Sequence, residues 1–269
     1  MTMVDTHAHY DHRQFAEDRN ELLAKLPERG VEAVVNVGSA LETSLASIHL
    51  AKKHSHFHAT VGVHPHYTLS FEAGHKEGWK DEEGESVGPV TIERLSELAC
   101  DPVVVAFGEI GLDFHHNFSP PDVQRKWFGK QLGLAISLGK PVVIHSREAD
   151  REVFDIIKAS SARNGVIHSF SGDAELAMEY IGLGFLVGVG GVVTFKNAFK
   201  LKEAVAKVPL DRILLETDCP YLAPHPNRGK RNDSTMLVYV AGEIARIKEV
   251  PLETVYQRTK ESAKRLFNI

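Results

Sequence analysis

Short apolar runs alternate with longer segments of helical periodicity along nearly the whole chain. The apolar runs cover residues 3–9, 31–37, 58–63, 103–109, 141–145, 165–168, 185–189 and 213–218. Segments with helical spacing follow them at 13–29, 41–54, 91–100, 122–138, 149–160, 174–182, 196–207, 233–248 and 252–267. The runs are almost entirely apolar before the polar residue at their end, as is typical of parallel strands covered on both faces. The pattern therefore predicts eight β-strands in alternation with α-helices.

Eight strands, each followed by a helix, match a (β/α)₈ TIM barrel in number and length. A doubly wound open sheet is the alternative. It usually has fewer strands, and it would not draw site residues from strands spread across the sheet. The chain has 269 residues, with no internal repeat and no interdomain linker. We therefore expect one barrel domain over residues 1–269.

One segment interrupts the alternation. Residues 66–89 follow the third strand and are polar and rich in glycine and acidic residues. We interpret them as a solvated surface loop, with a mobile lid over the site as the alternative.

Residues of metal-ligand type stand at the ends of five of the eight runs. They are His7 and His9 in the first run, Glu109 in the fourth, His145 in the fifth, His168 in the sixth and Asp218 in the eighth. The carboxyl ends of the strands of a parallel barrel meet at one mouth, where the active sites of this fold lie. We therefore expect the six side chains to form one shared site. His7 and His9 are two residues apart on a strand and so point to the same side.

Four histidines and two acids suit two divalent cations such as Zn²⁺, Mn²⁺, Fe²⁺, Co²⁺ or Ni²⁺, with Mg²⁺ also possible. Glu109 follows an apolar run, where an unpaired carboxylate is costly, and its two oxygens can bridge two ions. Asp218 is expected to bind the first ion and to accept a proton from a bridging water. We predict that Glu109 and Asp218 are catalytic and that the reaction is hydrolysis of a phosphate or carboxylic ester.

Positive side chains that follow the strand ends are candidates for binding an anionic substrate. Arg147 comes after the fifth strand, and Lys230 and Arg231 come after the eighth. Each is either a phosphate contact or a solvated charge. His64 ends the third strand and is either a substrate contact or a structural residue. Tyr221 flanks the mouth, where it either stacks on a base or packs at the rim.

The composition limits the class of substrate and the compartment. A net charge of −5 argues against binding nucleic acid by bulk electrostatics, so an anionic substrate must be held locally. The two cysteines, Cys100 and Cys219, are far apart and fit a reducing compartment, and Cys219 is interpreted as a small buried thiol. Without a recognisable secretory signal or a membrane-spanning run, we expect a cytoplasmic protein with no membrane partner. The sequence does not give the oligomeric state, and a monomer is our starting expectation.

Seven short motifs occur in order over almost the full length. They are Asp5-Thr6-His7-Ala8-His9, Gly62-Val63-His64-Pro65-His66, Gly108-Glu109-Ile110-Gly111-Leu112-Asp113, Ile144-His145-Ser146-Arg147, His168-Ser169-Phe170-Ser171-Gly172, Glu216-Thr217-Asp218-Cys219-Pro220-Tyr221-Leu222 and Gly229-Lys230-Arg231-Asn232. In these motifs the chain resembles the TatD family of metal-dependent deoxyribonucleases, within the amidohydrolase-like barrels. The resemblance implies a TIM barrel, two divalent cations and cleavage of phosphodiesters, typically in DNA and often from an end.

The resemblance also implies how the ligands divide between the ions. His7, His9, Glu109 and Asp218 would hold one cation, and Glu109, His145 and His168 the other. The chain departs from the family in two places. Asp233-Ser234 stands where the family usually has Glu-Pro, in a segment that borders the substrate, and the 66–89 segment is longer than usual.

Three functions follow, of which the first is our leading hypothesis. It is a hydrolase that cuts single-stranded or frayed DNA, with a metal-bridging hydroxide attacking phosphorus. The second keeps the barrel and the metals but takes a small amide, lactone or phosphoester, because substrate loops decide the chemistry that one barrel performs. The third is a metal-dependent binding or scaffold protein, which the complete set of ligand types disfavours.

Overall fold

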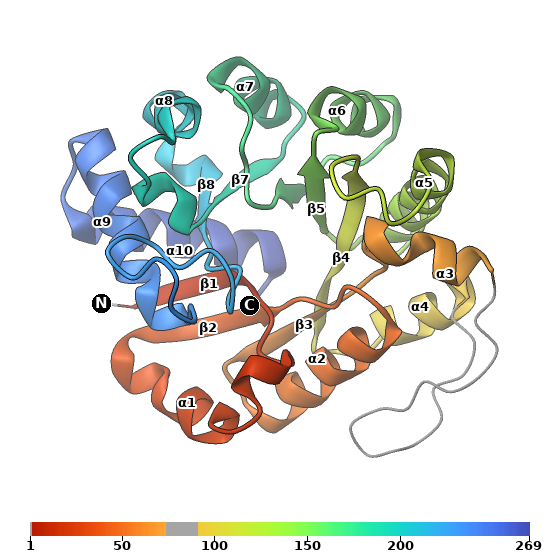
Figure 1. Cartoon of the computed structure of the whole chain (residues 1–269), viewed down its shortest axis with the longest axis horizontal. Helices are drawn as coiled ribbons and strands as arrows, with labels where there is room; N and C mark the ends of the chain where they lie inside the picture. Colours follow the sequence, from red (N-terminus) through yellow and green to blue (C-terminus); the bar gives the residue numbers. More distant parts are fainter. Residues whose placement is uncertain (1, 74–90) are drawn as a thin grey trace.

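A barrel of eight parallel strands forms the centre of the molecule (Figure 1). The computed structural model describes residues 2–73 and 91–269. The strands pair in sequence order as β1 (Met3–Ala8), β2 (Val31–Asn36), β3 (Phe57–Val61), β4 (Val104–Asp113), β5 (Val142–Arg147), β6 (Gly165–Ile167), β7 (Leu186–Val189) and β8 (Ile213–Leu215). A parallel bridge between Ala8 and Cys219 joins the two ends of the sheet. The predicted (β/α)₈ TIM barrel is confirmed.

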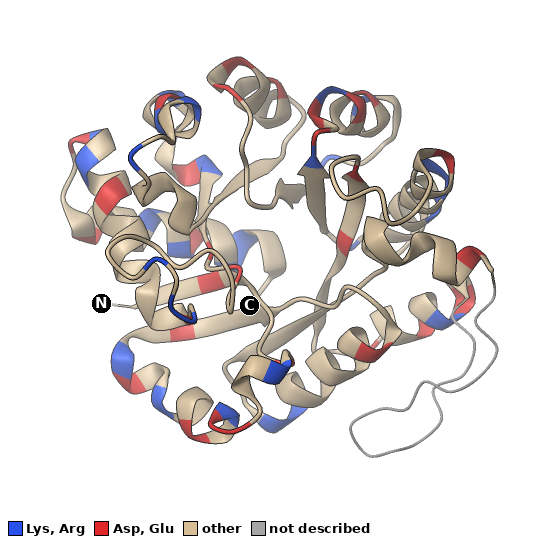
Figure 2. Cartoon of the chain, in the orientation of Figure 1, with Lys and Arg blue, Asp and Glu red and all other residues tan. Residues whose placement is uncertain are grey.

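Helices surround the strands as the outer layer (Figure 1). The α-helices are α1 (Arg19–Lys25), α2 (Leu41–Lys53), α3 (Thr68–Glu72), α4 (Ile92–Ala99), α5 (Pro121–Ser137), α6 (Asp150–Ala159), α7 (Ala174–Gly182), α8 (Phe199–Lys207), α9 (Leu237–Lys248) and α10 (Leu252–Phe267). Short 3₁₀ turns are η1 (Arg13–Phe15), η2 (Pro27–Arg29), η3 (Pro65–Tyr67), η4 (Gly191–Thr194), η5 (Leu210–Arg212) and η6 (Ser234–Met236). Figure 2 shows Lys and Arg interspersed with Asp and Glu over these helices. Among the described residues, no helix is both long and apolar enough to cross a membrane.

Two segments differ from the prediction. Residues 13–29 form a short helix between two 3₁₀ turns instead of one long helix, and Pro27, which lacks a backbone N–H, begins the second turn. The start of the 66–89 segment is helical, because α3 packs on α5, where Trp127 donates a 2.9 Å hydrogen bond to Glu72. The rest of the predicted loop or lid, residues 74–89, lies outside the described residues.

Apolar side chains fill the barrel and close one of its ends. A buried cluster joins side chains of seven strands to three residues of α10. Its strand members are Val4, Ala33, Val35, Ala106, Val143, Val166, Leu186 and Leu214, and its α10 members are Ala263, Leu266 and Phe267. Val4 lies near the amino end of β1 and belongs to the same cluster as the α10 residues, so we infer that α10 covers the amino ends of the strands. The opposite mouth is therefore the one available for polar chemistry.

The buried carboxylate of Asp5 ties the first strand to the chain that follows β8. It accepts hydrogen bonds from the Thr217 hydroxyl and the Ser234 hydroxyl, both at 2.6 Å, and from the Thr217 backbone N–H at 3.0 Å. Burial raises the pKa of Asp5 to about 7, and the hydrogen bonds from Ser234 and Thr217 oppose the rise. This contact holds the segment that carries Asp218 against the strand that carries His7.

We expect Asp5→Ala to lower the free energy of unfolding by about 3–5 kcal/mol, because it leaves several buried donors without an acceptor. Chemical denaturation measures the loss. The matched control is Asp211→Ala at an exposed position, where we expect a change within about 0.5 kcal/mol. A loss for Asp5→Ala no larger than that of the control would show that this contact does not hold the two segments together.

Candidate metal centre

The six predicted ligands converge at the carboxyl mouth of the barrel. His7 and His145 lie in β1 and β5, Glu109 lies within β4, and His9, His168 and Asp218 follow the ends of β1, β6 and β8. Five of them line one cavity of about 550 Å³, which also contains His64, His66, His116 and Arg147. The sixth, His7, is fully buried.

One group of donors is formed by His7, His9 and Asp218. The Nε2 atoms of His7 and His9 are 3.2 Å apart, and Asp218 Oδ1 lies 3.8 Å from the first and 3.3 Å from the second. His9 Nδ1 lies 3.0 Å from the Val37 carbonyl oxygen and donates to it. This hydrogen bond leaves the lone pair of His9 Nε2 free to bind a cation, since a neutral imidazole has one donor and one acceptor nitrogen.

Glu109 lies between this group and three histidines, of which His145 lies in β5 and His64 and His168 follow the ends of β3 and β6. Its Oε2 is 3.5 Å from His7 Nε2. Its Oε1 is 2.8 Å from His145 Nδ1, 3.6 Å from His64 Nε2 and 3.9 Å from His168 Nε2. The carboxylate is only 5% exposed, so both oxygens face ligand nitrogens and not solvent.

Further contacts orient the ligands. Glu216 Oε1 is 3.1 Å from His168 Nδ1 and accepts the Ser169 backbone N–H at 2.6 Å, which directs the other His168 nitrogen into the site. Space for this carboxylate requires a glycine at position 188, because a Cβ there would lie 2.2 Å from Glu216 Oε2. Asp218 adopts a left-handed backbone conformation, φ 56°, and its N–H donates to the His7 carbonyl oxygen at 2.8 Å. Such a conformation in a non-glycine residue is typical of functional sites.

The carboxylates set the charge of the site. Burial alone would raise the pKa of Glu109, but His64, His145 and His7 bring it well below its ordinary value. Burial opposes protonation of the histidines as well. Even so, Asp218 and Glu109 raise the pKa of His9 to about 9, and Glu216 raises that of His168 to about 10. Imidazole nitrogens and ionised carboxylates that converge in this way fit a divalent metal, whose charge would replace these protons.

Two of the predicted substrate contacts lie in the same cavity. Arg147, at the end of β5, is exposed and lines the cavity. His64 is buried, and its Nδ1 accepts the His66 backbone N–H at 3.2 Å. Burial among the neighbouring histidines holds the pKa of His64 well below its ordinary value, so the ring is neutral. Its Nε2 therefore carries the hydrogen and acts as a donor instead of a metal ligand.

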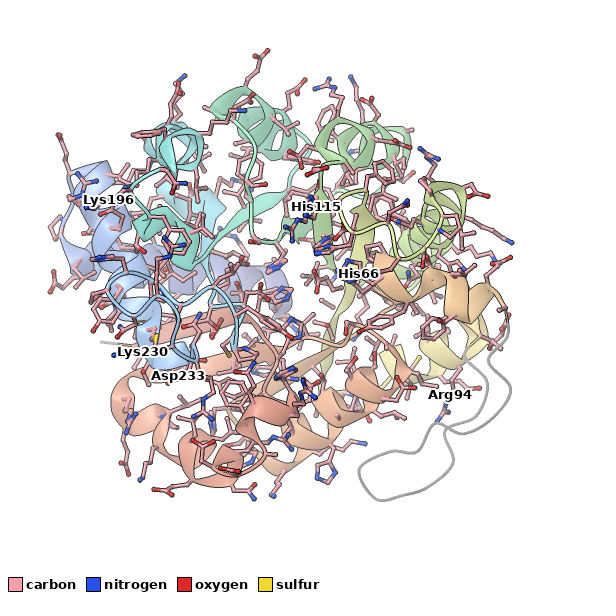
Figure 3. All side chains as sticks on the ribbon, in the orientation of Figure 1. His66, Arg94, His115, Lys196, Lys230 and Asp233 are labelled. Atoms are coloured by element: carbon pink, nitrogen blue, oxygen red, sulfur yellow. The ribbon has the colours of Figure 1, made fainter. Side chains whose placement is uncertain are left out.

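The other two predicted contacts line a neighbouring cavity of about 370 Å³, which shares Tyr221 and Leu222 with the first. Lys230 lies on this side of the molecule, well away from His66 (Figure 3). The guanidinium of Arg231 already binds both carboxylate oxygens of Asp18, at 2.8 and 2.6 Å. Binding of phosphate by Lys230 or Arg231 stays a prediction.

Sequence reasoning did not single out Asp113. β4 continues four residues beyond Glu109, and Asp113 Oδ2 lies 3.3 Å from His145 Nε2. The signal was present in the sequence, because residues an even number apart on a strand share a face. The same carboxylate also contacts His66 and His116.

Comparison with known proteins identifies the family. The family model described as TatD related DNase matches residues 4–268. The chain belongs to the TatD family. The uncharacterized metal-dependent hydrolase YabD of Bacillus subtilis strain 168 is 38% identical over 269 residues, 99% of each chain. The 3′–5′ ssDNA/RNA exonuclease TatD of Erwinia amylovora is 32% identical over 99% of this chain and 100% of that protein.

A solved structure agrees with this assignment. The crystal structure of YjjV, a TatD homologue from Escherichia coli K12, matches with a TM-score of 0.87 and 28% identity over 99% of this chain and 98% of that chain. This TatD-family chain is a metal-dependent hydrolase, and its His, Glu and Asp clusters are able to bind metal.

We expect metal binding at pH 7 to release at least two protons per chain, because His9 and His168 have pKa values of about 9 and about 10 before the cation binds and the pKa of His145 is also raised. Since both values lie above 7, the affinity for metal should rise as pH increases. Calorimetric titration of the metal-free protein with Zn²⁺, in buffers of different ionisation enthalpy, measures the release.

The variants His168→Asn and His56→Asn calibrate this titration. His168→Asn removes one of the protons that the cation displaces, so the number of protons released should fall by about one. The second changes a histidine whose pKa burial has lowered, so the release should stay unchanged. Binding without proton release in the wild type would contradict the charge state described above.

Proposed function

We propose that the chain hydrolyses phosphodiester bonds of single-stranded or frayed DNA from an end, with two divalent cations bound at the barrel mouth. This proposal rests on the position of Glu109 between two groups of imidazoles, because one carboxylate in that position can bind both ions. The names of relatives such as the Erwinia exonuclease support the nucleic-acid substrate.

The ligands divide between the ions in the proposed site. His7, His9 and Asp218 would hold one cation and His145 and His168 the other, and Glu109 lies where it could serve both. When bound, such a pair lowers the pKa of a shared water and stabilises charge on the attacking and leaving oxygens. The carboxylate of Asp218 takes the proton from the attacking water, and the buried ring of His9 beside it holds that carboxylate in place.

The remaining side chains of the mouth bind the substrate. The His64 Nε2–H, next to Glu109, donates to an oxygen of the scissile phosphate. Arg147 binds a flanking phosphate from the rim of the cavity. Tyr221 is 48% exposed at the boundary of the two cavities, where a base can stack on it while Lys230 contacts the next phosphate. A substrate that extends over both cavities favours a polynucleotide over a small ester.

The direct test compares the wild type with Glu109→Gln on single-stranded DNA labelled at either end, with Mg²⁺ or Mn²⁺. We expect stepwise cleavage by the wild type and a loss of about 10³-fold or more in kcat/KM for the variant, equivalent to about 4 kcal/mol. Glu253→Gln, on α10 at the closed end of the barrel, should retain wild-type activity. Wild-type protein that leaves DNA intact but cleaves a small amide, lactone or phosphoester would support the alternative substrate class instead.

Arg147→Ala should raise KM for DNA by about 5- to 30-fold and change kcat less, because a charge-assisted hydrogen bond to a non-reacting phosphate contributes about 1–2 kcal/mol. Steady-state kinetics on a labelled oligonucleotide measure the effect. Arg29→Ala, in η2 just before β2 and so at the closed end, should leave both constants unchanged. Equal effects of the two substitutions would remove Arg147 from the proposed substrate path.

A further inference from the structure

A third cluster of ligand atoms lies in the wall of the same cavity. His66 comes from η3, Asp113 ends β4, and His116 follows three residues later. Asp113 Oδ2 lies 2.7 Å from His66 Nε2 and 2.9 Å from His116 Nδ1. His66 and His116 line the cavity, whereas Asp113 is fully buried. These three side chains belong to neither group of donors around Glu109.

The carboxylate of Asp113 faces more donors than it can satisfy. Its Oδ1 accepts the backbone N–H groups of His115 and His116, at 3.0 and 2.9 Å. Its Oδ2 faces the rings of His66 and His116 and, at 3.3 Å, the Nε2 of His145. A carboxylate offers about four lone-pair sites, so five nitrogens exceed its capacity if every ring nitrogen donates a hydrogen, because three of them face one oxygen. The conflict disappears if two of the ring nitrogens present lone pairs to a cation instead of hydrogens.

We propose that a third divalent cation binds between His66 Nε2, Asp113 Oδ2 and His116 Nδ1. Two imidazoles and one carboxylate with open positions toward a cavity are typical of an accessible Zn²⁺ site, and Mn²⁺ or Co²⁺ also fits such donors. Tetrahedral bonds of about 2.0–2.1 Å place ligand atoms about 3.3 Å apart. The pairs at 2.7 and 2.9 Å therefore need to separate by about half an ångström.

The contacts around the three side chains show which parts of the site can move when the cation binds. Asp113 is fixed because its backbone N–H donates to Gln124 Oε1 at 2.8 Å, and the Ser119 hydroxyl donates to the His66 carbonyl oxygen at 3.1 Å. The ring of His116 is partly exposed and stacks on Phe118, with centroids 5.4 Å apart. The backbones of Asp113 and His66 are thus held in place, and the partly exposed rings of His66 and His116 turn slightly away from the carboxylate when the cation binds.

The third cation would lie next to His145, since Asp113 contacts both sites. Its open positions face the cavity, where they can take an oxygen of a phosphate beside the reacting one. This role in substrate binding rests on the proposed nuclease function, whereas the cation site itself does not.

The test counts bound ions in His116→Asn. Asparagine carries its amide nitrogen near the place of His116 Nδ1, so it can still donate to Asp113, but that nitrogen has no lone pair for a metal, and its amide oxygen is a much weaker ligand for Co²⁺ than an imidazole. His115→Asn is the matched control. His115 is the neighbouring residue and lies on the same side of the mouth as His66 (Figure 3). Its ring Nδ1 lies 2.6 Å from Glu148 Oε1, and it contacts Asp113 only through its backbone N–H, which the substitution retains. Equilibrium dialysis of metal-stripped protein against Co²⁺, with metal analysis and visible absorption spectra, measures the stoichiometry.

We expect about three ions per chain in the wild type and in His115→Asn, and about two in His116→Asn. The visible spectrum of His116→Asn should lack the absorption of the third Co²⁺ ion. Two ions in the wild type, or three in His116→Asn, would overturn the third site. Nuclease activity in a protein that binds only two ions would leave the proposed function intact, whereas three ions without any DNA cleavage would refute the function and keep the site.

Discussion

A buried carboxylate at the mouth of the barrel is the constraint on which the rest of the structure depends. Glu109 is almost inaccessible to solvent, and an ionised acid in that position requires positive charge on each side. His7 lies next to one oxygen and His145 next to the other. The arrangement therefore suits cations, and protonated histidines supply the positive charge in the protein alone.

The fold supplies this charge by its topology. Parallel strands present their carboxyl ends at one mouth, and α10 covers the other end with apolar side chains. Asp5 then fixes the chain after β8 against β1, which brings Asp218 next to His9 although they are distant in sequence. Asp113 and Glu216, which are not among the six ligands predicted around Glu109, orient His145 and His168. His9, His145 and His168 thus each have a second contact that sets the direction of the ring.

The sequence predicted the barrel and the convergence of the six ligands, because both follow from where apolar runs end. It could not predict contacts between surface loops. The sequence makes Arg231 a candidate for binding phosphate, but it does not show that the guanidinium of Arg231 pairs with the carboxylate of Asp18. The two residues are 213 positions apart, and no local pattern links them. The direction of His64 was equally hidden, since a backbone N–H, that of His66, decides which ring nitrogen carries the hydrogen. α3 was missed because a five-residue helix has too few positions to show a period.

The most direct test of the central claim is anomalous X-ray diffraction from crystals grown with Mn²⁺ or Zn²⁺, measured at the absorption edge of the metal. At Glu109 we expect two peaks about 3.5–4 Å apart, one on each side of the carboxylate, and these are separate from the third ion proposed at His66, Asp113 and His116. His7, His9 and Asp218 should surround the first peak, and His145 and His168 the second. A single ion at Glu109, or no ion that touches Glu109, would contradict the central claim.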